Sequence, residues 1–294
     1  MNPNDFLESI KLQFKSGNKH IQLIVINVFV FVIISLFGVL SFLSSSNLES
    51  SIVDFLALPS KIPNIILQPW SIFTYMFLHQ DFWHILFNML TFYWFGKLFL
   101  TYLTQRRLMH VYFLGGLFGA FFYVLFYNIL PVFANAEKAS ILLGASASIL
   151  AIMFTIASYQ PETSVNLMFI GQIRLKYLAI FIVVIDVLSI PNGNAGGMIA
   201  HIGGAFFGTL YGFGLKNGYD LSKYLTFNFS FKNPFKRKPK MKVHYKKPIS
   251  DEEYVKQKTD NQKKIDKILE KISQSGYESL SKEEKEMLFK ASNK

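Results

Sequence analysis

The chain has 294 residues, of which 51% are hydrophobic and 16% aromatic, and it contains no cysteine. This composition is typical of a polytopic membrane protein and unlike that of a soluble domain. The lack of cysteine excludes disulfides, thiolate metal sites and a cysteine nucleophile. The formal net charge of +11 is in the range of nucleic-acid-binding proteins, but the basic residues gather at the chain ends and in short loops, as membrane topology requires. We therefore expect no nucleic-acid partner.

Apolar segments of the length that a membrane span needs, roughly 20 residues, recur along the chain. In chain order they are 21–43, 82–103, 108–131, 140–159, 175–191 and 197–215. The first is too long for the apolar region of a signal peptide. The apolar residues before the second segment are interrupted at 79–81, so we interpret 70–81 as a re-entrant or interfacial stretch. The sequence thus predicts an all-α membrane protein with a bundle of six transmembrane helices and a short soluble helical tail.

The positive charges predict which ends of the spans face the cytoplasm. One set precedes the first span or follows the second and fourth: Lys11, Lys15, Lys19, Arg106, Arg107, Arg174 and Lys176. The tail after Lys216 is also strongly basic, whereas the opposite loops carry only Lys61 and Lys138. With six spans, both termini are then cytoplasmic. No targeting peptide is evident, which favours a bacterial inner membrane.

We predict four regions, which are a cytoplasmic N-terminal segment (1–20), a six-helix membrane domain (21–216), a basic juxtamembrane linker (217–249) and a small cytoplasmic helical module (250–294). Residues 232–247 hold eight Lys or Arg and no acid. This stretch either binds anionic lipid headgroups or serves as a positive-inside topology anchor.

The helical module is predicted from two capping boxes, in which a serine is followed three residues later by a glutamate. They are Ser250 with Glu253 and Ser281 with Glu284. Apolar residues at helical spacing follow the first box, and Gly276 is expected to end that helix. No chemistry is predicted for this region.

Two polar motifs lie near the starts of the fourth and sixth apolar segments. Residues 144–147 read Gly-Ala-Ser-Ala, and residues 200–204 read Ala-His-Ile-Gly-Gly. A hydroxyl and an imidazole are costly in hydrocarbon, so intramembrane polar residues indicate function. The second, fourth and sixth spans run in the same direction, which places Ser146, His201 and His84 at one depth, roughly 6–9 Å below the outer surface. A serine and a histidine that meet there form a nucleophile and its base.

Each of these residues also has a structural interpretation. Ser146 lies among small residues that favour helix packing. His201, taken alone, fits a structural role in a hydrogen bond between helices as well as it fits a catalytic one. His84 and Asn88 are spaced i and i+4, so they share a helix face and can donate two hydrogen bonds to a developing negative charge or make a polar helix contact. No metal is expected, because the second member is Asn and no HExxH motif occurs.

Two further polar residues, His79 and Asp186, lie in or next to the predicted spans. His79 is expected to have a structural role and not to share a helix face with His84. Asp186, the one acid within a predicted span, is expected to bind backbone or interfacial water in preference to orienting His201 as a third member of a triad.

Over about residues 20–215 the chain resembles the rhomboid family of intramembrane serine proteases. The resemblance is carried by Trp70, Thr74, His79, His84-Ile85-Leu86-Phe87-Asn88, Gly144-Ala145-Ser146, Ala200-His201, Gly204 and Gly208. It implies a six-helix bundle whose water-filled cavity opens to the outside, with Ser146 as nucleophile and His201 as general base, and no cofactor. It further implies an oxyanion hole made by His84, Asn88 and the Ser146 backbone N–H, and single-span membrane proteins as substrates.

The chain departs from the family pattern at three places. Ala147 follows the serine where many members have Gly, Leu150 stands where many have an aromatic that stacks on the base, and Ser71 follows Trp70 where many have Arg. The competing hypotheses are a catalytically inactive relative that binds transmembrane clients, and a small transporter or channel. The latter predicts internal repeats or broken helices with paired charges, which the sequence does not show.

Overall fold

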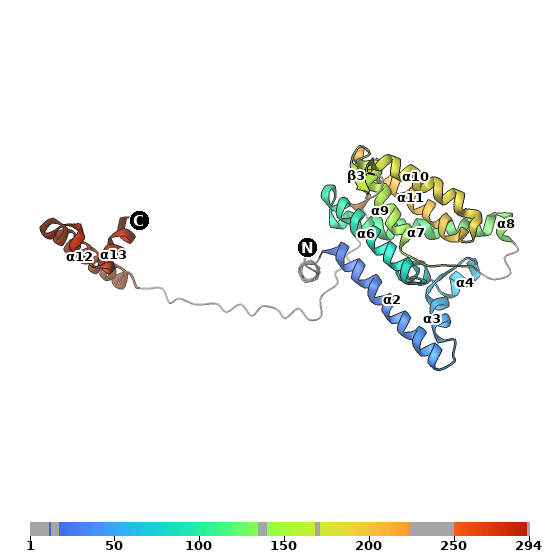
Figure 1. Ribbon diagram of the computed structural model, residues 1–294, viewed down its shortest axis with the longest axis horizontal. Helices are drawn as coiled ribbons and strands as arrows, with labels where there is room; N and C mark the ends of the chain where they lie inside the picture. The colour runs from blue at the N-terminus through green and yellow to red at the C-terminus, as the bar shows by residue number, and fades with distance from the viewer. Residues whose placement is uncertain (1–11, 13–17, 135–139, 168–170, 224–249, 293–294) are drawn as a thin grey trace. The chain divides into compact units, whose positions relative to one another are not determined.

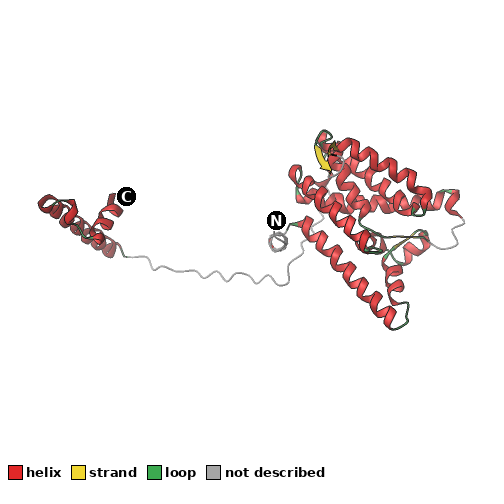
Figure 2. Cartoon of the chain, in the orientation of Figure 1, coloured by secondary structure: helices red, strands yellow, loops and turns green. Residues whose placement is uncertain are grey.

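The computed structural model describes residues 12, 18–134, 140–167, 171–223 and 250–292. It divides into two compact units, Met1–Phe229 and Ser230–Lys294 (Figure 1). Helices make up most of both units (Figure 2). The predicted lipid-binding stretch, 232–247, lies outside the described residues.

Every apolar segment predicted as a span overlaps one helix of the first unit. These helices are α2 (Lys19–Leu43), α6 (Phe82–Tyr102), α7 (Gln105–Ile129), α9 (Ser146–Tyr159), α10 (Leu175–Ser189) and α11 (Ala195–Lys216). Within the described part of the chain, α2, α7 and α11 are long and apolar enough to cross a membrane, and α9 is apolar but shorter. With 14 and 15 residues, α9 and α10 are about 21–23 Å long, less than the hydrocarbon thickness of about 30 Å. The count of six spans therefore stays a prediction.

Polar side chains at the helix starts fix where several of these helices begin. Asn18, Asp81, Thr104 and Asn194 precede α2, α6, α7 and α11, and each accepts a hydrogen bond from a backbone N–H of the first turn. Such caps satisfy N–H groups that have no partner inside the helix. Two of them, Asp81 and Asn194, also border the candidate site described below.

Short elements connect the long helices. Between α2 and α6 lie α3 (Leu48–Leu56), β1 (Leu58–Pro59), α4 (Ile62–Leu67), α5 (Ser71–Thr74) and the 3-10 helix η1 (Tyr75–Phe77). Further along are α8 (Pro131–Ala134), β2 (Ile141–Leu142), β3 (Ser164–Leu167), β4 (Gly171–Arg174), η2 (Ile190–Asn192) and η3 (Leu221–Lys223). Antiparallel pairing joins β1 to β2 and β3 to β4, so the regular structure of the described residues is helical apart from these two short strand pairs.

Helix α9 is the centre of the first unit, with its residues 147–157 buried against α7, α11 and α6. The tightest packing is between α9 and α11. A Cβ added at Gly204 would overlap the Ala147 carbonyl oxygen, and one at Gly208 would overlap that of Ala151. Only glycine allows the two backbones to approach so closely.

An ion pair joins the start of α7 to the segment that follows α11. Arg107 donates two hydrogen bonds to Asp220 Oδ2, at 3.0 and 2.8 Å, and Asp220 Oδ1 accepts from the Ser222 N–H at 2.9 Å. Burial alone raises the pKa of Asp220, but the hydrogen bonds from Ser222 and the Arg107 charge outweigh burial and lower that pKa to about 2. This carboxylate is therefore ionised at neutral pH and links the start of α7 to the segment after α11.

The second unit contains α12 (Asp251–Ser275), η4 (Tyr277–Ser279) and α13 (Lys282–Ser292). The capping box at Ser281 forms in both directions, with the Ser281 N–H bonded to Glu284 Oε2 at 2.7 Å and the Glu284 N–H bonded to Ser281 Oγ at 3.3 Å. Ser250 caps α12 through one bond, its Oγ accepting from the Glu253 N–H at 3.3 Å. Among the described residues of this unit, Ile268 and Leu280 are the buried apolar ones.

Candidate active site

Ser146 is the first residue of α9, at the end of a turn that only glycine adopts easily. Gly144 has a φ of +125°, in the left-handed region, and its N–H donates to the Tyr75 carbonyl at 2.9 Å. The sequence predicted that the fourth span starts at 140, and this is wrong. Residues 141–142 form a strand, and the turn at Gly144 delays the helix to Ser146. The hydroxyl therefore lies where first-turn N–H groups lack helical acceptors.

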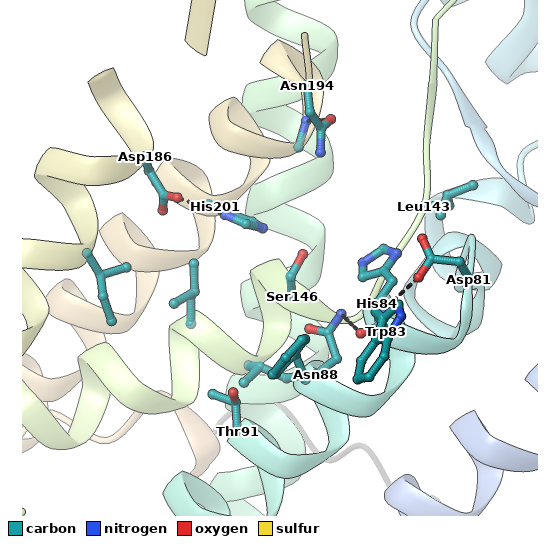
Figure 3. A pocket seen from close by; sticks show the side chains of 15 residues that line it. Asp81, Trp83, His84, Asn88, Thr91, Leu143, Ser146, Asp186, Asn194 and His201 are labelled. Atoms are coloured by element: carbon teal, nitrogen blue, oxygen red, sulfur yellow. Dashed lines mark hydrogen bonds and ion pairs between the residues drawn. The ribbon is translucent and has the colours of Figure 1, made fainter. Parts of the chain in front are cut away.

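His201 lies on α11, and its ring faces the Ser146 hydroxyl across a shared pocket (Figure 3). The close contact of Gly204 with Ala147 brings these two parts of the helices together. No hydrogen bond joins Ser146 Oγ to His201 in the described structure; such contacts are often long in empty sites and tighten when substrate binds. The two residues thus border one space, and their predicted direct contact stays a prediction.

Asp186 on α10 contacts the other side of the His201 ring. Its Oδ1 lies 3.2 Å from His201 Nδ1, and the carboxylate is buried. The preference for backbone or interfacial water as the partner of Asp186 was therefore wrong. Sequence reasoning had noted this acid within an apolar segment but had no means of telling which neighbouring side chain it reaches.

His84 presents a hydrogen-bond donor toward the Ser146 side of the pocket. Its backbone N–H is bonded to Asp81 Oδ1 at 2.9 Å, and its Nδ1 accepts from the Gln80 N–H at 3.4 Å. With Nδ1 an acceptor, the hydrogen of the neutral ring is on Nε2. A Cβ added at Gly144 would lie 3.1 Å from this Nε2 and 3.6 Å from Ser146 Oγ, so both atoms border the space over Gly144.

Asn88 follows one turn after His84 and also lines the pocket. Its Nδ2 donates to the His84 carbonyl at 3.0 Å, which leaves its second N–H for a ligand. His84 and Asn88 thus share a helix face as predicted, and both border the space that Ser146 faces (Figure 3).

His79 is buried next to this group, and its ring packs edge-on against that of His84 with 5.1 Å between the centroids. His79 precedes α6 and so shares no face of that helix with His84, and the contact between the two rings lies outside helical periodicity. Burial, with the nearby His84, lowers the pKa of His79 to about 4. The ring is therefore neutral at physiological pH.

The pocket has a volume of about 550 Å³, the size of a small-ligand site. Its lining combines the polar groups above with apolar side chains: Asp81, Trp83, His84, Phe87, Asn88, Thr91, Leu143, Ser146, Ile149, Leu150, Ile182, Asp186, Asn194, Gly197 and His201. Among the residues that the structure describes, no cluster of three metal-ligating side chains is present. Trp83 and Asn194 had no signal in the sequence that would assign them to this site.

The family model for the rhomboid domain matches residues 67–218, more than half of the chain. The chain belongs to the rhomboid family. This assignment covers all the residues that line the pocket, and it makes the chain an integral membrane protein. The supporting glycines 144, 204 and 208 lie in the rhomboid domain at the turn and the helix contact described above.

A curated relative of this rhomboid is RHOMBOID-like protein 12, mitochondrial, of Arabidopsis thaliana, which is 28% identical over 144 residues. The match covers 46% of the chain and 43% of the relative, so the chain spans less than half of the relative's length. A second family model, a family of unknown function (DUF6576), matches residues 250–294.

Proposed function

We propose that this rhomboid is an intramembrane serine endopeptidase that cleaves transmembrane segments of single-span membrane proteins near the outer face. The observation that carries the proposal is the arrangement of Ser146 and His201 on opposite sides of one pocket, beside the donors of His84 and Asn88. A nucleophile, a base and oxyanion donors around one space are the parts that acyl transfer needs.

In this mechanism His201 takes the Ser146 proton as Oγ attacks a peptide carbonyl, and an acyl-enzyme forms through a tetrahedral intermediate. His201 then returns the proton to the leaving amine, and water releases the acyl group by the same steps. The His84 Nε2–H, the free Asn88 N–H and the Ser146 N–H stabilise the oxyanion. Loss of one such donor typically costs about 3–4 kcal/mol of transition-state stabilisation.

The substrate helix has to unwind locally, because a spanning helix holds its carbonyls in internal hydrogen bonds. Small or helix-breaking residues near the outer end of a substrate span lower this cost. The proposal therefore places cleavage at such residues, and mapping of the cut site by mass spectrometry checks it.

The test is a cleavage assay with the purified full chain in liposomes and a single-span substrate. Ser146→Ala and His201→Ala are expected to abolish cleavage. Ser148→Ala is the matched control, because this buried hydroxyl two residues later has no hydrogen-bond partner in the described structure. Undiminished cleavage by either site variant refutes the assignment.

A serine-directed fluorophosphonate probe separates the enzyme from an inactive relative. Labelling of Ser146 requires an activated hydroxyl, so labelling that disappears in His201→Ala supports catalysis. A well-folded chain that binds transmembrane clients but takes up no label is instead a client-binding protein.

The proposal includes cytoplasmic placement of both termini. Because the chain has no cysteine, single cysteines at Lys19 and at Ser45 offer a direct test with a membrane-impermeant thiol reagent. Reagent outside the cell is expected to label the cysteine at 45 and not the one at 19; the reverse pattern contradicts the orientation. The bacterial inner membrane stays a prediction, and the plant relative, which is named mitochondrial, does not support it.

A further inference from the structure

We infer that Asp186 is a positioning residue that holds the His201 ring in the tautomer and orientation that proton transfer from Ser146 needs. The inference rests on the proposed function and adds a third member to the pair of residues assigned there.

The first support is the hydrogen bond between Asp186 and His201. A carboxylate only accepts hydrogen bonds, so the contact of 3.2 Å between Oδ1 and Nδ1 places the ring hydrogen on Nδ1. The other ring nitrogen, Nε2, then carries a free lone pair in the neutral ring. Figure 3 shows the carboxylate and the Ser146 hydroxyl on opposite sides of the imidazole, so the lone pair faces the nucleophile.

The second support is that nothing else fixes the ring by a polar or aromatic contact. Among the described residues, the bond to Asp186 is the one hydrogen bond of the His201 side chain, and no aromatic ring packs against it. Leu150 follows Ser146 by one turn and lines the same pocket. Its aliphatic side chain offers no hydrogen bond or ring stacking that would orient the His201 imidazole. Rotation of the imidazole is therefore restrained mainly by the carboxylate.

The third support is the cost of the carboxylate itself. Asp186 is the one acid of α10, and its side chain is 11% exposed. The one basic residue of that helix, Lys176, lies ten residues earlier, about 15 Å along the axis, and pairs with Glu162. A buried carboxylate without a cation is strongly unfavourable. An imidazolium that forms at His201 during catalysis supplies the missing charge, so the pair is most stable at that step.

A hydrogen bond that only holds α10 against α11 is the alternative, and substitutions separate the two roles. Asp186→Asn keeps a hydrogen-bonding group of the same size but removes the negative charge. The amide can also donate a hydrogen bond, whereas the carboxylate only accepts. For a positioning residue we expect kcat to fall by about tenfold or more, with KM and the melting temperature unchanged. Asp186→Glu is expected to restore part of kcat, and Asp54→Asn, at an exposed acid, is the matched control. Asp186→Asn with the kcat of the unmodified chain overturns the inference.

A second measurement does not depend on activity. In the full chain labelled with ¹⁵N-histidine, the His201 signals are identified by their loss in His201→Ala. We expect the hydrogen on Nδ1 in the unmodified chain and its redistribution to Nε2 in Asp186→Ala. A ring that carries its hydrogen on Nε2 in the unmodified chain overturns the inference. A chain that shows the expected tautomers but cleaves nothing refutes the proposed function and leaves the positioning role supported.

Discussion

The contact between Gly204 and the backbone of Ala147 gives a quantitative prediction. A methyl group at Gly204 would overlap the Ala147 carbonyl oxygen and lie 2.8 Å from the carbonyl carbon, whereas ordinary contacts begin at 3.4 Å. The obstacle is backbone and cannot rotate away, so Gly204→Ala must push α11 from α9 by at least about 0.6 Å, the shortfall at the carbonyl carbon, because the carbonyl oxygen lies closer still. Overpacking of this kind typically costs about 1–3 kcal/mol.

The same displacement acts on the candidate site, because Gly204 follows His201 by one helical turn and Ala147 is next to Ser146. A misplacement of about 1 Å between reacting groups lowers rates by about 100-fold, so the displacement here is expected to cost about tenfold. We therefore expect Gly204→Ala to lower both the melting temperature and the rate of substrate cleavage in liposomes.

Gly214→Ala is the matched control on the same helix. Its added methyl would meet its nearest atom, the Tyr219 carbonyl oxygen, at 3.5 Å, an ordinary contact. Glycine to alanine in a helix is otherwise favourable by up to about 1 kcal/mol, so this variant is expected to keep the activity and stability of the unmodified chain. If Gly204→Ala behaves like Gly214→Ala in both assays, the argument from close helix contact is refuted.

Two further variants test buried polar contacts. Asp220→Asn is expected to lower stability by about 2 kcal/mol at pH 7. The depressed pKa of Asp220 gives a stabilisation that is present above its ordinary value of 3.8 and lost as pH falls towards 2. The melting temperatures of the variant and of the unmodified chain should therefore converge in acid. A difference in melting temperature that does not change with pH contradicts the ion pair with Arg107. Tyr75→Phe removes the buried hydroxyl that donates to the Gly116 carbonyl at 2.6 Å and is expected to cost about 1 kcal/mol, while Tyr254→Phe, at an exposed tyrosine, should leave the melting temperature unchanged. Equal melting temperatures for both tyrosine variants argue against this bond.

The grouping of the site residues could be predicted from the sequence. The shared direction predicted for the second, fourth and sixth spans brought Ser146, His201 and His84 to one end of the bundle, although the depth of Ser146 was counted from a span start at 140 that the structure moves to 146. The start of α9 could not be predicted, because the left-handed φ of Gly144 depends on the hydrogen bond from its N–H to the distant Tyr75 carbonyl. Hydropathy places the boundary of such a segment at its outermost apolar residue and does not detect a turn within it.

Side-chain partners were harder to predict than segments. The partner of Asp186 depends on how α10 and α11 are rotated about their axes, which the spacing of residues in the sequence does not define. The contact of His79 with His84 arises outside helical periodicity, so spacing rules did not reveal it. The shortness of α9 and α10 likewise reflects loops and strands that replace helix at their ends.

The turn that carries the nucleophile is tethered to a loop far away in sequence. Ser60 donates its N–H to the Ser140 carbonyl and Gly144 donates to Tyr75, both at 2.9 Å. These two bonds join the turn before Ser146 directly to residues 60 and 75, so a displacement of that region is expected to move the start of α9 without passing through the intervening chain.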